Sequence, residues 1–203
     1  MTHHHNHQQA MNHPRKGSRI TVDPIKSLDD IKAIKVLLAD KPRDLLLFTM
    51  GINNGLRIGD LLQLKVGQVR HLKPGEYIMV REQKTGKENC LMVNKAVYKA
   101  LRSYLDKVQP KDDDYLFASR QGGSPLTVQR VHQMIKGWTK QINLQGNYGT
   151  HSLRKTFGYI QRTQFKVGFE VLAKRFNHSS PAVTMRYLGL SSDDVNGILM
   201  NEI

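Results

Sequence analysis

One motif near the C-terminal third of the chain places a histidine and an arginine where both could act on a phosphate. The segment THSLR, residues 150–154, begins a predicted helix. His151 and Arg154 are three residues apart and therefore share one helical face. They lie in the first turn, where free backbone N–H groups and the helix dipole attract an anion and disfavour a cation. An arginine there is explained by a phosphate that binds, and the alternative is an arginine paired with an acid elsewhere.

A second arginine follows a glycine turn in the segment GLRIGD, residues 55–60. Asp60 stands three residues after Arg57 and can hold its guanidinium in place. A fixed guanidinium presents a planar fork that matches two phosphate oxygens. The alternative is a purely structural Arg–Asp pair.

The segment QKTGK, residues 83–87, is typical of a hairpin turn that can reach into a cleft. Lys84 could then protonate a leaving alkoxide, provided that neighbouring cations lower its pKa. Most hairpin lysines are only solvated, and Lys87 is an equally placed candidate.

The segment NHSSPAVTMRYLG, residues 177–189, carries His178 and Tyr187 on what reads as one short helix. A tyrosine hydroxyl has an unperturbed pKa of about 10 and needs help to become a nucleophile. Two arginines, a lysine and a histidine would favour the phenolate and a negatively charged transition state. A tyrosine in the core or at its rim is the plain alternative.

Taken together, these motifs run in the order Arg, Lys, His-x-x-Arg, His, Tyr, and in this order the chain resembles the tyrosine recombinase (phage integrase) family. GLRIGDLLQL is similar to the family's first arginine box, HSLRKTF to its second, and NHSSPAVTMRYLG to the third box with the nucleophile. The resemblance spans residues 22–196, which is nearly all of the predicted folded part.

The resemblance implies an enzyme that cuts and rejoins DNA without a metal or other cofactor. Tyr187 would attack the scissile phosphate and leave a 3′-phosphotyrosyl link and a free 5′-hydroxyl. Lys84 would protonate the leaving oxygen, and His151 would act as the general base or orient the site. A 5′-hydroxyl from another strand could then reverse the reaction, with integration, excision or inversion as the outcome.

The remaining implied roles concern the phosphate itself. Arg57 and Arg154 would clamp its non-bridging oxygens, His178 would hydrogen-bond to it, and Asp60 would support Arg57. The implied partners are double-stranded DNA, further copies that assemble on it as a tetramer in the synaptic complex, and DNA-bending accessory proteins. The segment after Tyr187 resembles the helix that family members dock onto a neighbour. A type IB topoisomerase and a non-catalytic DNA-binding relic remain alternatives.

Two features depart from the family pattern. No N-terminal core-binding domain precedes the catalytic domain, so we expect a catalytic fragment, a truncated gene or a one-domain enzyme similar to the fimbrial invertases. The third box has Phe176-Asn177 where the family commonly has Leu-Gly. These two residues can change the local packing, and asparagine tolerates the left-handed conformation that glycine would supply.

Composition supports a polyanion as partner. The formal net charge is +14, and residues 1–19 contribute only three of these charges. A basic surplus of that size on the folded part favours nucleic acid, although a basic but unrelated enzyme is possible. Cys90 is the only cysteine, which excludes an intramolecular disulfide and a thiolate zinc site. The absence of a membrane-length apolar run or a secretory signal predicts a cytoplasmic protein with no membrane partner. The family resemblance further implies a nucleoid-associated protein of bacterial or phage origin.

Hydrophobic periodicity and capping residues predict how these motifs are positioned. Residues 1–19 form a histidine-rich tail that we expect to be disordered, and a metal-binding protein built on that tail is a further alternative. Residues 20–203 form the predicted catalytic domain, of the α+β class and mainly α. The predicted helices begin after Ser27, at Pro42, near Gly59, after Asn94, after Thr127, at Thr150, at Phe169, after Ser180 and at Ser192. Three short strands, residues 66–72, 77–82 and 89–93, predict a small three-stranded antiparallel sheet.

Overall fold

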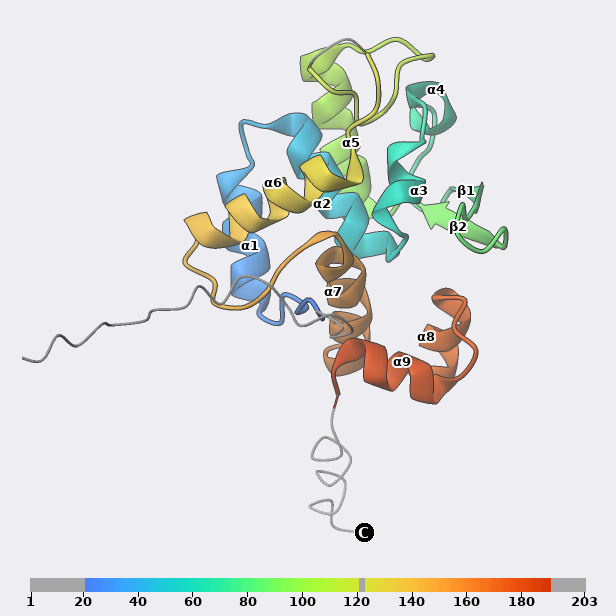
Figure 1. Ribbon diagram of the computed structural model, residues 1–203. Helices are drawn as coiled ribbons and strands as arrows, with labels where there is room; N and C mark the ends of the chain where they lie inside the picture. The colour runs from blue at the N-terminus through green and yellow to red at the C-terminus, as the bar shows by residue number, and fades with distance from the viewer. Residues whose placement is uncertain (1–20, 121–122, 191–203) are drawn as a thin grey trace, which may run out of the picture.

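The computed structural model describes residues 21–120 and 123–190 of the 203-residue chain. It shows a body of helices with one hairpin at its side, the mainly helical fold that the sequence predicted (Figure 1). The elements in chain order are α1 (Leu28–Leu37), α2 (Pro42–Asn54), α3 (Ile58–Leu62), α4 (Val66–Val69), β1 (Tyr77–Arg81), β2 (Glu88–Met92), α5 (Lys95–Val108), α6 (Val128–Gln141), α7 (Thr150–Thr163), α8 (Phe169–Arg175) and α9 (Pro181–Leu188). The predicted tail over residues 1–19 and the predicted helix from Ser192 lie outside the described residues.

The helix starts follow the predicted capping residues. The side-chain oxygens of Ser27, Thr127 and Ser180 each accept a hydrogen bond from a backbone N–H in the first turn of α1, α6 and α9. Pro42 and Pro181 occupy the first turn of α2 and α9, where a missing N–H costs nothing. These predictions are confirmed.

Helix α2 is the centre of the core. Its residues 46–51 are buried on every side, as expected for a segment that is apolar nearly all round. It packs against α5 and α7, and the ring of Phe48 meets Trp138 of α6 edge-on at 6.1 Å. No helix within the described ranges is long and apolar enough to cross a bilayer.

The prediction of a strand over residues 66–72 was wrong. Its first four residues form α4, and the sheet has two strands. Val66 and Val69 are both fully buried, and residues three apart share a face only in a helix. The side chain of Gln68 also accepts the backbone N–H of Lys65 at 2.7 Å, which stabilises a helical turn.

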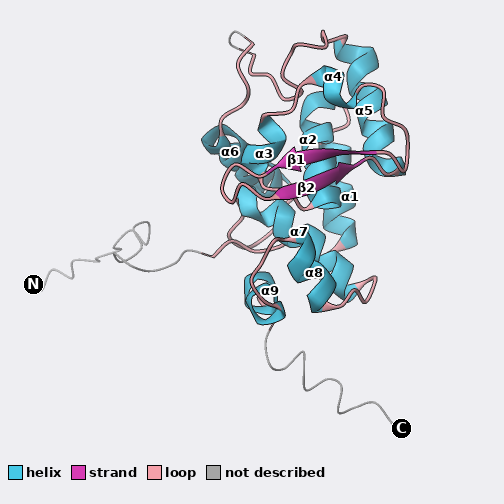
Figure 2. Ribbon diagram, turned by 90° about the vertical axis from the view of Figure 1, so that its right-hand side faces the viewer, coloured by secondary structure: helices cyan, strands magenta, loops and turns pink. Residues whose placement is uncertain are grey.

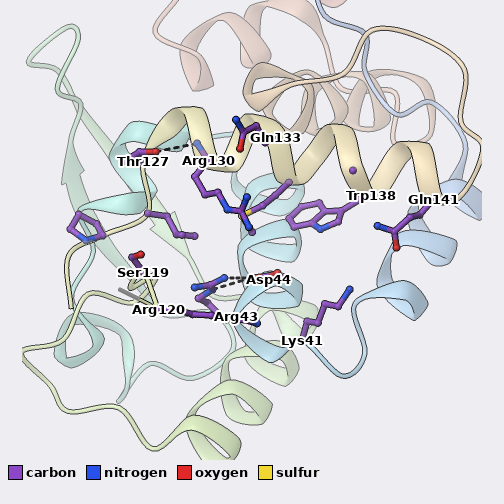
Figure 3. Close-up of a pocket in the computed structure, with 14 residues that line it drawn as sticks. Lys41, Arg43, Asp44, Ser119, Arg120, Thr127, Arg130, Gln133, Trp138 and Gln141 are labelled. Atoms are coloured by element: carbon purple, nitrogen blue, oxygen red, sulfur yellow. Dashed lines mark hydrogen bonds and ion pairs between the residues drawn. The ribbon is translucent and has the colours of Figure 1, made fainter. Parts of the chain in front are cut away.

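The two strands pair antiparallel, with Tyr77 opposite Met92 and Arg81 opposite Glu88. In both ribbon views the hairpin and α8 lie on the same side of the helical body (Figure 2). The turn between the strands, which carries Lys84, is therefore held near the segment that leads to α9.

Helix α9 packs closely against α7. Phe176 and Leu188 form a small buried cluster with Leu172. A Cβ atom on Gly158 of α7 would lie 2.7 Å from both the Phe176 ring and the Leu188 side chain. The glycine thus permits the close approach of α9 to the middle of α7.

Gly55 ends α2 in the left-handed conformation, with φ at 61°. A Cβ atom there would lie 2.4 Å from the ring of Phe157 on α7. The chain therefore needs glycine at this position for two separate reasons, its backbone angle and the close approach of α7.

We predict that Gly55→Ala lowers the free energy of unfolding by about 2–5 kcal/mol, from left-handed strain of about 1–2 kcal/mol and overpacking of about 1–3 kcal/mol. Gly189→Ala is the matched control, because Gly189 is also left-handed, at φ 70°, and no atom lies within 4 Å of its added Cβ. Urea unfolding of both variants measures the difference. Equal losses would contradict the steric role of Phe157.

Candidate active site

The six predicted site residues come from five parts of the fold. Arg57 stands at the start of α3, Lys84 in the hairpin turn, His151 and Arg154 in the first turn of α7, His178 between α8 and α9, and Tyr187 near the end of α9. The charges of Arg57 and Arg154 act on the pKa values of His151, His178 and Tyr187. The fold therefore gathers these side chains into one electrostatic neighbourhood.

Arg154 is the most deeply held of these residues. Its side chain is almost fully buried, at 2% exposure. One terminal nitrogen donates to the carbonyl of Gly55 at 2.5 Å and the other to the carbonyl of Phe176 at 2.7 Å. Burial lowers its pKa, but a guanidinium remains charged in proteins. Because both carbonyls are neutral, these two hydrogen bonds do not cancel the positive charge of the guanidinium.

Arg57 has a different carboxylate partner from the one expected. Its Nη1 atom lies 2.5 Å from Oε2 of Glu82, at the end of β1. Asp60, the expected partner, instead accepts the backbone N–H of Gln83 at 2.9 Å. Asp60 therefore holds the hairpin turn, while Glu82 holds the guanidinium.

Glu82 is fully buried and ionised. Burial by itself would raise its pKa, but hydrogen bonds from Thr85 and Asn89 and the contact with Arg57 outweigh that effect and lower the pKa to about 2. This role could not be predicted from the sequence, because Glu82 is 25 positions from Arg57 and ends an ordinary strand pattern.

Tyr187 has a buried hydroxyl and rings packed around it. The ring centroids of His178 and Phe176 lie 5.1 Å and 5.6 Å from its own, and Nζ of Lys155 lies 5.2 Å from it. Burial raises the pKa of Tyr187 to about 12, although Arg154 and Arg57 pull it downwards. The phenol is therefore neutral at ordinary pH and needs a base to become a nucleophile.

His151 and His178 are both neutral at pH 7. His151 is exposed on one side, and its pKa is lowered by the protein packed around it and then by the nearby cations, which include Lys84. Burial and the two arginines lower the pKa of His178 to about 4. A neutral imidazole can accept a proton, which is the property that a general base needs.

Lys84 lies on the exposed part of the hairpin turn. Its charge contributes to the lowered pKa of His151, so the structure brings it towards α7. Its side chain remains free to swing towards a bound substrate.

Two further cations near the site were missed. Arg175 of α8 donates to the carbonyls of Asn54 and Cys90 and to Oδ1 of Asn89, and so joins α8 to α2 and the hairpin. Lys155 is buried at 4% exposure beneath Tyr187. Asn177 has a φ of 53°, the left-handed conformation that asparagine tolerates.

Comparison with known proteins places the fold in a defined family. Residues 19–193 match the model described as "Phage integrase family". The chain is 35% identical over 175 residues to the "Probable integrase/recombinase YoeC" of Bacillus subtilis, covering 85% of this chain and 92% of that protein. It is 30% identical over 152 residues to "Tyrosine recombinase XerC" of Caldanaerobacter subterraneus subsp. tengcongensis, covering 72% of this chain and 41% of that protein.

Solved structures share the fold. The crystal structure of XerA recombinase superposes with a TM-score of 0.73 at 22% identity, over 92% of this chain and 68% of that chain. XerH bound to its palindromic difH substrate gives a TM-score of 0.70 at 17% identity, over 91% of this chain and 55% of that chain.

We predict that the imidazole of His178 stays neutral on acidification until the pH approaches 4, well below the ordinary value of 6.5. Because the unfolded chain takes up this proton first, the free energy of unfolding should fall as the pH drops from 6.5 towards 4. NMR titration of the histidine rings, with His178→Asn to assign the resonance, measures the pKa. A midpoint near 6.5 would show that the ring is not buried among the arginines.

Proposed function

We propose that this chain, which belongs to the phage integrase family, is a site-specific DNA recombinase that cuts and rejoins strands through a 3′-phosphotyrosyl intermediate. The observation that carries the proposal is the buried guanidinium of Arg154, bonded to two carbonyls and acting on the pKa of Tyr187. A fixed cation beside a tyrosine is what attack on a phosphodiester requires.

In the proposed cleavage step the Tyr187 oxygen attacks the scissile phosphorus while the bond from phosphorus to the 5′-oxygen breaks. The phenolic proton passes to the neutral imidazole of His151, and the ammonium of Lys84 gives a proton to the leaving 5′-oxygen. Two protons thus move and no electrons are gained or lost. The phosphate ester on tyrosine conserves the energy of the broken bond, so a 5′-hydroxyl can reverse the step.

Arg57 and Arg154 would bind the non-bridging oxygens, which gain charge in the transition state. Arg154 cannot rotate away, because both of its terminal nitrogens are already bonded to carbonyls. Arg57 is fixed at one nitrogen by Glu82 and keeps other donors for the phosphate. Clamps of this kind are preorganised, so no energy is spent on orienting them during the reaction.

The proposed partner is duplex DNA, bound by several copies of the chain. XerH has been solved on a difH substrate and lambda integrase as a dimer on a COC′ core site. For this chain we propose assembly on DNA, with a tetramer as the recombining unit and DNA-bending proteins as accessories. The charge of +14 supports a DNA substrate.

We predict that nicked suicide duplexes, made from the repeats that flank the gene, form a covalent adduct on Tyr187 and that Tyr187→Phe forms none. Peptide mass spectrometry after nuclease digestion identifies the adduct. DNA binding by the variant should persist and weaken steeply with salt, because counterions are released from the duplex. Tyr77→Phe is the matched control, since Tyr77 is exposed on β1, and it should retain the adduct. An adduct that survives in Tyr187→Phe would assign the nucleophile elsewhere.

We predict that Lys84→Ala slows cleavage of an ordinary duplex by about 10²–10⁴-fold, the usual contribution of a positioned acid. A substrate with sulfur as the bridging 5′-atom should restore most of the rate, because a thiolate leaves without a proton. Lys87→Ala, in the same turn, should change the cleavage rate by the same factor on both substrates. Single-turnover kinetics measure the rates, and a thiolate-specific recovery in Lys87→Ala would transfer the acid role to Lys87.

A further inference from the structure

The carboxylate of Glu82 joins two parts of the proposed site through one oxygen atom. Oε2 lies 2.5 Å from Nη1 of Arg57 and accepts the hydroxyl of Thr85 at 2.6 Å. The other oxygen, Oε1, accepts from Nδ2 of Asn89 at 3.0 Å. One buried side chain therefore contacts a phosphate-binding arginine and the residue that follows Lys84.

The backbone on both sides of Lys84 is tied to these same groups. The carbonyl of Glu82 accepts the N–H of Gly86 at 2.8 Å, which closes the turn, and Thr85 is bonded to the Glu82 carboxylate. On the other side, the N–H of Gln83 donates to Asp60 of α3 at 2.9 Å. Lys84 is thus the one residue between two anchored neighbours.

The network continues to α8. Oδ1 of Asn89 accepts from Arg175 at 2.5 Å, and its Nδ2 also reaches the carbonyl of Arg175 at 3.2 Å. Arg175 immediately precedes Phe176, whose carbonyl holds Arg154. The hairpin is therefore connected to both arginines that the proposed function assigns to the phosphate.

Stability alone does not explain a fully buried carboxylate at this position. A buried ion pair often contributes no more than an apolar pair of the same size, whereas it fixes one arrangement of its partners. Here the fixed arrangement relates Arg57 to the turn that carries Lys84. A second link between α3 and this turn is the hydrogen bond from the Gln83 N–H to Asp60.

We propose that Glu82 is a positioning residue that couples the phosphate-binding Arg57 to the proton-donating Lys84. The inference rests on the proposed function, because it assumes that Lys84 protonates the leaving oxygen. Glu82 touches neither the phosphate nor the leaving group and acts only through its two neighbours. Breaking the Thr85 contact should misplace the acid, and neutralising Glu82 should disturb both the acid and the guanidinium.

The test compares Thr85→Val and Glu82→Gln on ordinary duplexes and on duplexes with a bridging 5′-sulfur. Thr85→Val replaces the hydroxyl of an exposed residue with a methyl group, so it leaves the core intact. It removes the contact with Glu82 and also the acceptor of the Lys87 N–H at 3.3 Å. We expect this variant to cleave the ordinary duplex at least about tenfold more slowly than the unaltered protein, which is part of the contribution of a positioned acid. On the sulfur substrate its cleavage rate should recover. Glu82→Gln should recover only in part, because Arg57 also loses its charged partner.

Lys84→Ala is the reference and Lys87→Ala the control from the same turn, and melting temperatures establish that each variant is folded. If Lys84→Ala recovers on sulfur while Thr85→Val and Glu82→Gln stay equally slow on both substrates, the coupling is overturned and the proposed function stands. If Lys84→Ala itself fails to recover, the acid role of Lys84 is overturned and the coupling falls with it. Should Glu82→Gln fail to fold, Thr85→Val alone decides.

Discussion

The buried guanidinium of Arg154 is the interaction on which the rest of the site depends. Its two carbonyl partners belong to Gly55, at the end of α2, and to Phe176, at the end of α8. A single side chain on α7 therefore fixes the relative positions of three helix ends, and two of these lead directly into Arg57 and His178. Both carbonyls lie where a helix has ended and its last acceptors lack partners within the helix. The cation satisfies them and remains charged, so its structural role does not compete with the proposed binding of a phosphate.

Burial and the charges of the two arginines together set the pKa values of the neighbouring groups. Arg154 and Arg57 add to the burial that holds the pKa of His178 at about 4, while burial keeps the pKa of Tyr187 at about 12 despite them. Both groups are neutral before DNA arrives. A phosphate would add negative charge beside the phenol, which makes free phenolate still less favourable. Loss of the phenolic proton should therefore accompany the attack on phosphorus, and this requires a base that is neutral in advance, as His151 is.

Local sequence signals predicted the elements well, because capping and periodicity act within a few residues. Ser27, Thr127 and Ser180 each begin a helix where the sequence placed one. The strand expected at residues 66–72 was wrong, since a short run with two valines fits either period and only burial against the rest of the core decides between them. The family resemblance predicted that the six site residues lie close together. It did not predict the residues that contact Arg57. The contact of Glu82 with Arg57 joins residues 25 positions apart, and the contacts of Arg175 join residues 85 or more positions apart. No local pattern encodes such contacts.

The two carboxylates near Arg57 have different pKa values because their surroundings differ. The pKa of Asp60 is raised, chiefly by burial and further by the charge of Glu82, although the Gln83 N–H and the arginines oppose this. Glu82 receives several hydrogen bonds and the guanidinium contact, so its pKa lies at about 2. Like charges at close range favour such a split, because the second negative charge is easier to lose than the first. As pH falls, Asp60 is therefore protonated before Glu82. The ion pair between Glu82 and Arg57 persists at pH values at which the Asp60 carboxylate is already protonated. The charge that orients the guanidinium accordingly resides on the strand that leads to Lys84 and not on the helix that follows Arg57. The hairpin therefore holds Arg57 in addition to carrying Lys84.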